Sequence, residues 1–355
     1  SLVKRRRPRP ERIDTIHMLR TAGIGDTVLL LGALAQVRET YPRARFRVFL
    51  GSSNAAMAPF FPKGVEIVVL PVTRPLASLA ILRQNPCDVM LDFGLWPRLD
   101  ALMAGFSGAR WVIGTRRAGQ FRHGLYDVAV PFDEQRHAYD NYAAIVAPLG
   151  VSLKRFPSID LGAERQNIPG EDPKIVVHMF PGGRNADLRT WAADKWVQLI
   201  DRLAADGFRV LLTGSKANYE TAAAIRSCTR RPEFVELAAG CSLRETIGLL
   251  TASDCVVTVD TGVMHLAAAA GCRIVSLHGP MSPRNYGPLS DTAISLEAAG
   301  CGSCARLGGE RCQRRKRCID DISIERVMAA VHEATFRKAP SSKSALHPYR
   351  QEAAQ

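Results

Sequence analysis

The sequence contains no long apolar run. Hydrophobic residues make up 46% of its 355 positions, but no stretch reaches the roughly 18 to 20 consecutive apolar residues that a membrane-spanning helix needs. The apolar segment of a secretory signal is also missing, because the basic residues 4–7 are followed by proline and more charge. These absences predict a globular protein of the cytoplasm, long enough for two domains of ordinary size.

Aromatic residues are few, at 7%, and no module with aromatic stacking positions for nucleic acid is visible. The net charge is nevertheless +13, and residues 1–165 carry 23 basic against 14 acidic side chains. In the absence of such a module, this basic half favours an anionic membrane surface or a phosphorylated acceptor as partner over nucleic acid. Much of the excess lies in residues 4–12, so a merely solvated tail is the alternative explanation.

The chain does contain a repeated alternation of strand and helix patterns. Residues 13–19 have the pattern of a strand, Gly23 and Gly25 that of a turn, and residues 28–38 that of a helix. The alternation continues to a segment rich in proline, glycine and charge at 150–173, and then starts again. Strands that alternate with helices predict an α/β fold with parallel sheets covered on both faces.

We therefore predict two Rossmann-like domains that face each other across a cleft, in which a ligand would bind. The predicted domains cover residues 13–165 and 174–335, with tails at 1–12 and 339–355.

The most informative stretch begins at Asp260. It follows an apolar, β-branched run at 255–259 and precedes an alanine-rich helix. Asp260, Thr261 and Gly262 thus stand where a strand ends and a helix begins, a place whose free N–H groups and positive dipole suit a diphosphate. His265, one turn further on, can face the same crevice. On spacing alone, an ordinary junction with Asp260 as the helix cap explains the pattern equally well.

From Asp260 the chain reads Asp-Thr-Gly-x-x-His-x-Ala-x-Ala, followed by a predicted strand, Gly279-Pro280 and Tyr286-Gly287-Pro288. This order resembles the nucleotide-sugar signature of the family 9 glycosyltransferases, the bacterial ADP-heptose:lipopolysaccharide heptosyltransferases. The resemblance covers residues 13–335 and is strongest over 255–290. It implies a GT-B fold and an inverting enzyme that moves heptose from an ADP-sugar to an acceptor hydroxyl. The expected setting is lipopolysaccharide core synthesis, with no cofactor for catalysis.

The resemblance gives Asp26 the central role. In the family, a Gly-Asp turn after the first strand supplies the base that takes the proton of the acceptor hydroxyl, and Gly25-Asp26-Thr27 matches that turn. Arg20 is predicted to point to the same crevice and to meet a phosphate or carboxylate of the acceptor. The alternative is that Asp26 only caps the N-terminus of the helix.

The resemblance also implies a donor site in the second domain. Arg189 stands where the family has a lysine two residues before a tryptophan, here Trp191, to hold the donor's phosphates. Gly182 and Gly183 form a turn suited to backbone contact with phosphate, and Glu220 is a candidate for the nucleotide's ribose. The predicted donor-binding set is Gly182, Gly183, Arg189, Glu220, Asp260, Thr261, Gly262 and His265. The alternatives are that Arg189 is a solvated loop residue, that Gly182 and Gly183 form only a turn, and that Glu220 is a surface residue in a first helical turn.

Four cysteines lie within segment 301–318, namely Cys301, Cys304, Cys312 and Cys318. Four thiolates in so short a span, among basic neighbours, match a structural tetrahedral site for zinc or iron. Related glycosyltransferases often carry a cysteine-rich segment here, and in a protein-modifying subgroup it resembles an iron-binding finger. Its role would be to fold a loop against the donor domain. Two disulfides or free thiols are the alternatives, and a reducing cytoplasm disfavours disulfides.

The partners that the resemblance implies are an ADP-sugar donor and an anionic glycolipid or protein acceptor, with peripheral contact to the inner membrane surface as an open option. A small-molecule acceptor is a further alternative. Outside the transferases, a nucleotide-sugar-binding protein without turnover stays open. A Rossmann dehydrogenase is disfavoured because the first glycine turn lacks the third glycine of the dinucleotide fingerprint.

Overall fold

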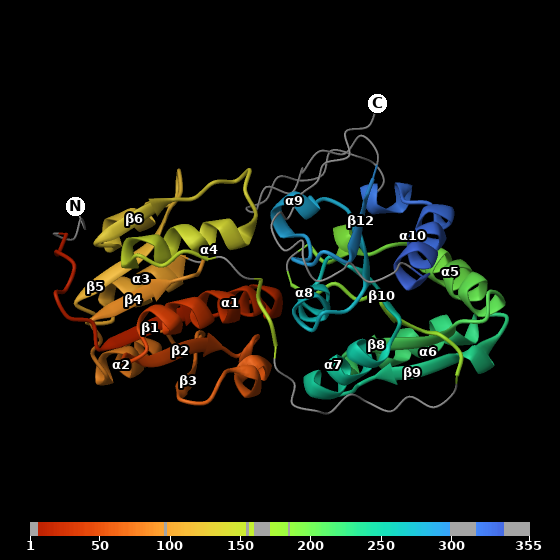
Figure 1. Cartoon of the computed structure of the whole chain (residues 1–355), viewed down its shortest axis with the longest axis horizontal. Coiled ribbons are helices and arrows are strands. Elements are labelled where there is room, and N and C mark those ends of the chain that lie inside the picture. Colours follow the sequence, from red (N-terminus) through yellow and green to blue (C-terminus); the bar gives the residue numbers. More distant parts are fainter. Residues whose placement is uncertain are drawn as a thin grey trace. The chain divides into compact units, whose positions relative to one another are not determined.

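The computed structural model describes residues 6–95, 98–153, 156–159, 171–183, 185–298 and 317–336. The chain divides into two compact units, Ser1–Ile159 and Asp160–Gln355. Each unit has its own parallel sheet with helices on it (Figure 1). Within the described residues, no helix has the length and apolar character that crossing a membrane would require.

The first unit is a sheet of six strands in the order β3-β2-β1-β4-β5-β6. Its elements along the chain are β1 (Thr15–Arg20), α1 (Ile24–Thr40), β2 (Arg45–Gly51), η1 (Ala55–Phe60), β3 (Val65–Leu70), α2 (Pro75–Gln84), β4 (Val89–Asp92), α3 (Arg98–Phe106), β5 (Trp111–Arg116), η2 (Arg122–Leu125), β6 (Val128–Pro131), α4 (Ala138–Val146) and η3 (Ala147–Leu149). All neighbouring strands are parallel, and Ile16 of β1 is in register with Phe46 of β2 and Val89 of β4.

The path of the chain through this sheet reverses at β1. From β1 it moves outward to β2 and β3, and then returns to β4 on the other side of β1. Right-handed crossovers in opposite directions place α1 on one face and α2 and α3 on the other. In agreement, α1 packs beside α4, and α2 beside α3. Ligands of such sheets bind at the carboxyl ends of the strands flanking the reversal, here β1 and β4.

The second unit repeats this plan in the order β12-β11-β10-β7-β8-β9, again with parallel neighbours. Its elements are β7 (Lys174–His178), η4 (Asp187–Arg189), α5 (Ala193–Ala205), β8 (Arg209–Gly214), η5 (Lys216–Asn218), α6 (Tyr219–Ser227), η6 (Pro232–Phe234), β9 (Val235–Ala239), α7 (Leu243–Ala252), β10 (Cys255–Val259), α8 (Gly262–Ala269), β11 (Ile274–His278), α9 (Pro283–Tyr286), β12 (Ala293–Glu297), η7 (Cys318–Asp321) and α10 (Ile324–Phe336). Here the reversal lies between β7 and β10.

Burial explains why these elements form. The central strands β7 and β10 are runs of β-branched residues that are buried on both faces, as parallel strands under helices must be. Helix α5 turns Trp196, Leu199 and Leu203 into the core, where α10 packs on it. Trp196 meets Trp191 edge to face, with ring centroids 5.0 Å apart. Each such side chain contributes about 1.5–3 kcal/mol of transfer free energy.

The predicted α/β class with two parallel sheets is confirmed, and so is the alternation that suggested it. Two details differ from the sequence reading. Helix α1 begins at Ile24, so Asp26 lies inside its first turn and not in a turn before it. The edge strands β9 and β12 were not expected, because their half-exposed sequences lack a continuous apolar run. The domain bounds 13–165 and 174–335 and the roles given to them stay predictions.

Two histidines end central strands of the second unit. His178 ends β7, is buried, and its Nδ1 lies 3.0 Å from the Thr213 hydroxyl. His278 ends β11, and its Nε2 lies 2.9 Å from the Ser276 hydroxyl. Burial lowers the pKa of His178 to about 4 and that of His278 to about 3. Both imidazoles are therefore neutral wherever the protein is folded near neutrality.

This burial predicts a loss of stability in mild acid. Between pH 6.5 and about 4, His178 is protonated in the unfolded chain but stays neutral in the folded chain. Because the unfolded state binds more protons in this range, the free energy of unfolding falls as the pH falls. One such proton changes it by up to about 1.4 kcal/mol per pH unit. His178→Gln should flatten that slope by up to this amount in urea titrations at several pH values. An unchanged slope in the variant would contradict the assignment, and His278→Gln provides an independent repeat.

Candidate functional site

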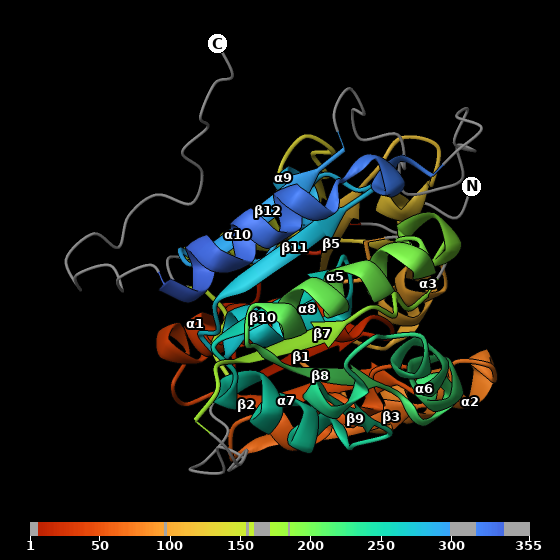
Figure 2. The same cartoon turned by 90° about the vertical axis from the view of Figure 1, so that its right-hand side faces the viewer.

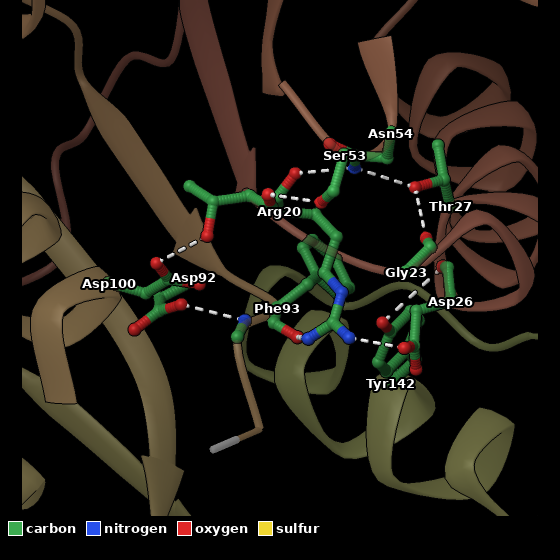
Figure 3. A network of polar contacts seen from close by, with 12 residues as sticks. Arg20, Gly23, Asp26, Thr27, Ser53, Asn54, Asp92, Phe93, Asp100 and Tyr142 are labelled. Atoms are coloured by element: carbon green, nitrogen blue, oxygen red, sulfur yellow. Dashed lines mark hydrogen bonds and ion pairs between the residues drawn. The ribbon is translucent and has the colours of Figure 1, made fainter. Parts of the chain in front are cut away.

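The carboxyl end of β1 carries an ion pair. Arg20 is the last residue of β1, and its guanidinium pairs with Oδ2 of Asp26 in α1 (Figure 3). Nη1 of Arg20 donates to the carbonyl oxygen of Phe93, just after β4, at 3.0 Å. The Arg20 side chain is 7% exposed, whereas that of Asp26 is 24% exposed. The pair and the Phe93 contact therefore link the ends of β1 and β4, the two strands that flank the reversal in strand order. The Asp26 carboxylate stays partly exposed to solvent.

Arg20 remains a cation in this setting. Burial disfavours its charge, but the carboxylates of Asp26 and Asp100 and the Tyr142 hydroxyl act in the opposite direction, and the pKa of Arg20 is raised. Because a guanidinium stays protonated in any case, the site holds a fixed positive charge beside Asp26.

Gly23 makes this geometry possible. It precedes α1 with φ of +85°, in the left-handed region, and a Cβ at this position would collide with Oδ2 of Asp26. Gly23 is also the N-cap of α1, and no side chain caps that helix. The alternative that Asp26 is the N-cap is therefore wrong; its carboxylate is held by Arg20 instead.

Asn54, which follows β2, holds the turn that carries Asp26. Its Oδ1 accepts from the Gly51 N–H at 2.8 Å, and its Nδ2 donates to the Arg20 carbonyl at 2.9 Å and to the Thr27 hydroxyl at 2.8 Å. The Thr27 hydroxyl in turn donates to the Gly23 carbonyl at 2.7 Å (Figure 3). Sequence reasoning missed Asn54, because an asparagine after a strand has the pattern of an ordinary turn residue.

Two further carboxylates lie at the same sheet edge but are closed off. Asp92 at the end of β4 is fully buried and accepts from Arg122 at 2.9 Å and from the Tyr126 hydroxyl at 2.5 Å. Asp100 in α3 is 1% exposed and accepts from the Thr21 hydroxyl at 2.6 Å. Burial, and then the charge of Asp92, raise the pKa of Asp100 to about 6. Of the three aspartates in this network, only Asp26 can meet a substrate (Figure 3).

In the second unit the structure joins three of the predicted donor residues. Nη1 of Arg189, in η4, donates to the Asp260 carbonyl at 2.8 Å and lies 3.6 Å from Oδ2 of the same residue. Nη2 donates to the carbonyl of Gly182. Arg189, Gly182 and Asp260 therefore meet at the carboxyl ends of β7 and β10, the strands of the reversal.

The helix start beside this group is uncapped by side chains. Thr261 is the N-cap of α8 and Gly262 its first residue, and the Thr261 side chain makes no capping bond. His265 lies one turn into α8 and is buried. At Gly182 and Gly183 a Cβ would meet no atom within 4 Å, so packing within the described residues does not demand glycine there. Only at Gly183, with φ of +78°, does the backbone itself favour it.

Glu220 lies in the first turn of α6, after β8, and is exposed. No described contact joins it to Arg189 or Asp260, so its place in the donor set rests on the sequence alone.

The predicted cysteine site is only partly described. Cys301, Cys304 and Cys312 lie outside the described residues. Cys318 begins η7 and is buried, next to Gly279, at a place where η7 packs on η4 with Arg189. Among the described residues, no group of three or more His, Cys, Asp or Glu could hold a metal ion.

Comparisons with known proteins all lead to one family. The model of "Glycosyltransferase family 9 (heptosyltransferase)" matches residues 100–308. Lipopolysaccharide heptosyltransferase 2 of Salmonella typhimurium is 26% identical over 60% of this chain, which covers 66% of that protein, just under two thirds of its length. Lipooligosaccharide heptosyltransferase 2 of Haemophilus ducreyi is 25% identical over 87% of this chain and 96% of its own length. The solved structure of E. coli ADP-heptose lps heptosyltransferase II superposes with a TM-score of 0.74 at 22% identity, covering 91% of this chain and 99% of that one.

The position of Asn54 generates a prediction about stability. Asn54→Ala leaves the buried Gly51 N–H and the Arg20 carbonyl without their side-chain partners. Each unsatisfied buried group costs about 1–3 kcal/mol, so urea denaturation should show the variant less stable by about 2–4 kcal/mol. Ser53→Ala is the matched control, because the only bond that the Ser53 hydroxyl makes among the described residues is long, 3.5 Å to the Thr21 carbonyl. Equal losses in the two variants would show that Asn54 does not hold the turn.

Proposed function

The chain belongs to glycosyltransferase family 9 (heptosyltransferase), and on this premise we propose that it transfers heptose from ADP-heptose to an acceptor hydroxyl with inversion. The observation that carries the proposal is Asp26, the accessible one of the three aspartates described at the reversal of the first sheet, fixed there by a buried cation. The names of its relatives, which pair heptose transfer with ADP-heptose and lipopolysaccharide, support the choice of donor and acceptor.

In the proposed reaction Asp26 is the general base. As the acceptor oxygen attacks the anomeric carbon of the heptose, the Asp26 carboxylate takes the hydroxyl proton. The bond from that carbon to the diphosphate breaks, and its electron pair leaves with ADP. Arg20 holds Asp26 in position, and its charge also favours a phosphate or carboxylate of the acceptor near this edge.

The diphosphate is proposed to bind at the carboxyl ends of β7 and β10. Arg189 supplies a guanidinium there, and the uncapped start of α8 at Thr261 and Gly262 supplies free N–H groups. The open space over Gly182 and Gly183 suits a close approach of phosphate to backbone. Asp260 holds Arg189, and His265 lies one turn further along the helix. Stabilising the negative charge that develops on the leaving diphosphate is the larger electrostatic task in this reaction.

We also propose the finer assignments that the sequence suggested. Glu220 binds the ribose of the donor, residues 13–165 bind the acceptor and residues 174–335 the donor. The acceptor is an anionic glycolipid in lipopolysaccharide core synthesis, at the cytoplasmic side of the inner membrane. A protein acceptor is the second candidate, to be separated from the first by assay of both.

The decisive experiment compares transfer with donor binding. Asp26→Asn keeps the shape of the side chain but cannot accept the proton, so kcat should fall by at least about 10²–10⁴-fold. ADP affinity, measured by calorimetry, should stay unchanged, because Asp26 has no part in the donor site. Retained transfer in this variant would refute the assignment of the base.

Arg189→Ala is the matched comparison, because it should weaken ADP binding by about tenfold or more through loss of a charge-assisted contact. If Asp26→Asn and Arg189→Ala lost ADP binding equally, Asp26 would also take part in binding the donor, and the proposed division between base and donor site would be wrong. If wild-type protein bound ADP but transferred no heptose to any acceptor, the chain would be a nucleotide-sugar-binding protein.

For the cysteine segment we propose one structural zinc or iron held by Cys301, Cys304, Cys312 and Cys318. The spacing of the four thiols supports this, as does the burial of Cys318 against the Arg189 loop. Such an ion would stabilise the fold of the segment and take no part in the transfer.

Metal analysis of the purified chain should find about one zinc or iron per molecule if four thiolates form a tetrahedral site. Cys301→Ser with Cys304→Ser should abolish it and lower the melting temperature. Cys87→Ser, a buried cysteine of the first unit, is the control and should keep the metal. Absence of metal from wild-type protein purified without chelator would overturn the proposal.

A further inference from the structure

We infer that the α2–α3 layer of the first unit is a docking surface for an anionic membrane. The layer consists of α2, α3 and η2 with Phe121, the residue before η2. It covers one face of the first sheet, opposite α1, and Figure 2 shows α2 and α3 together on one side of the unit. The inference concerns binding to lipid and does not depend on the proposed transfer reaction.

Exposed apolar side chains gather on this layer. Among the described residues, eight large hydrophobic side chains are exposed, and four of them lie here: Leu76 at 83%, Phe121 at 78%, Leu102 at 44% and Phe106 at 39%. None of the eight lies on α1 or α4, which cover the other face of the same sheet. Apolar side chains concentrated on one face of a water-exposed layer mark an interaction surface.

The spacing of the exposed residues places them in one line along each of the two helices. On α3, Arg98, Leu102 and Phe106 are four residues apart and all exposed, so they form one line along the helix. On α2, Leu76 and Arg83 are seven residues apart and lie on one line in the same way. The helices end side by side, because Nε of Arg83 donates to the Phe106 carbonyl at 2.8 Å.

The charge of the layer has one sign. Its exposed charged residues are arginines: Arg83 and Arg98 on the helices, with Arg74 directly before α2. Its one acidic residue, Asp100, points inward and is 1% exposed. A surface that combines apolar side chains with arginines and shows no carboxylate is complementary to anionic headgroups above an acyl layer.

The backbone conformation of Phe121 also indicates a use for its exposed ring. With φ of +56° it occupies the left-handed region, where a bulky residue is strained and asparagine or glycine would fit better. It nevertheless exposes most of its ring. The loop is tied to the layer, since Nη2 of Arg98 donates to the Gly119 carbonyl at 3.2 Å. An exposed aromatic ring held at an unfavourable φ is expected when the ring itself has a use, here insertion among lipid headgroups.

The test is vesicle binding by the whole chain. Wild-type protein should co-sediment with vesicles of phosphatidylcholine and phosphatidylglycerol at least about tenfold more strongly than with phosphatidylcholine alone. The variant Leu76→Glu with Phe121→Asn should lose about tenfold in partitioning onto the anionic vesicles. Both substitutions suit their positions, because Leu76 lies in a first helical turn, where an acid is favourable, and Asn accepts a positive φ.

The matched control is Tyr219→Glu with Phe336→Asn, which makes the same change of charge at exposed aromatic positions of the second unit. It should bind anionic vesicles like the wild type. Equal losses in the control would assign the binding to overall charge and overturn the inference, as would equal binding of wild type to neutral vesicles. A wild type that ignores vesicles but self-associates, with the Leu76 and Phe121 variant monomeric, would make this layer a contact between copies of the chain instead.

Discussion

Arg20 and Asp26 form an ion pair at the carboxyl end of β1, and the residues around the pair keep it in one place. A buried guanidinium is costly unless its charge is matched, and Asp26 and the Phe93 carbonyl provide that match. Gly23 permits the approach by lacking a side chain, and Asn54 fixes the turn between the two residues. The carboxylate is therefore positioned by the same contacts that keep the end of the first strand folded, so its position and the stability of this turn are coupled.

The two units share one topology but differ in the charge of the groups that they present at the carboxyl ends of their strands. Each sheet reverses its strand order next to its first strand, and each reversal gathers polar side chains at the carboxyl ends. In the first unit a buried cation supports an exposed carboxylate, which can accept a proton. In the second, Arg189 is held by carbonyl oxygens of Gly182 and Asp260 beside the positive end of α8, an arrangement that suits an anion. A sugar transfer from a diphosphate donor needs one site of each kind.

Sequence patterns predicted the features that depend on neighbours along the chain. The central strands were visible because burial on both faces leaves continuous apolar runs, and Asp260 was visible because it directly follows such a run. Asp26 was named through its match to the family's Gly-Asp turn. Features that depend on strand order were not visible. Asn54 reaches the Asp26 turn only because β2 pairs with β1. The edge strand β9 was missed because one-sided burial makes its sequence indistinct. For Glu220 the structure shows exposure without a partner site, so its role rests on the family resemblance alone.

The buried aspartates offset the positive charge at the sheet edge that carries Asp26. Arg20 and Arg122 bring two positive charges there, and Asp26, Asp92 and Asp100 bring three carboxyl groups. Burial, and then the charge of Asp92, raise the pKa of Asp100, so this edge has no net charge when Asp100 is protonated and one net negative charge when it is ionised. With so little net charge, this edge has no long-range field for phosphate groups, and an anionic acceptor would meet Arg20 there only through a short-range contact. Long-range attraction would come from basic residues elsewhere on the first unit, among them Arg83 and Arg98 on α2 and α3, which no exposed carboxylate of their own layer offsets.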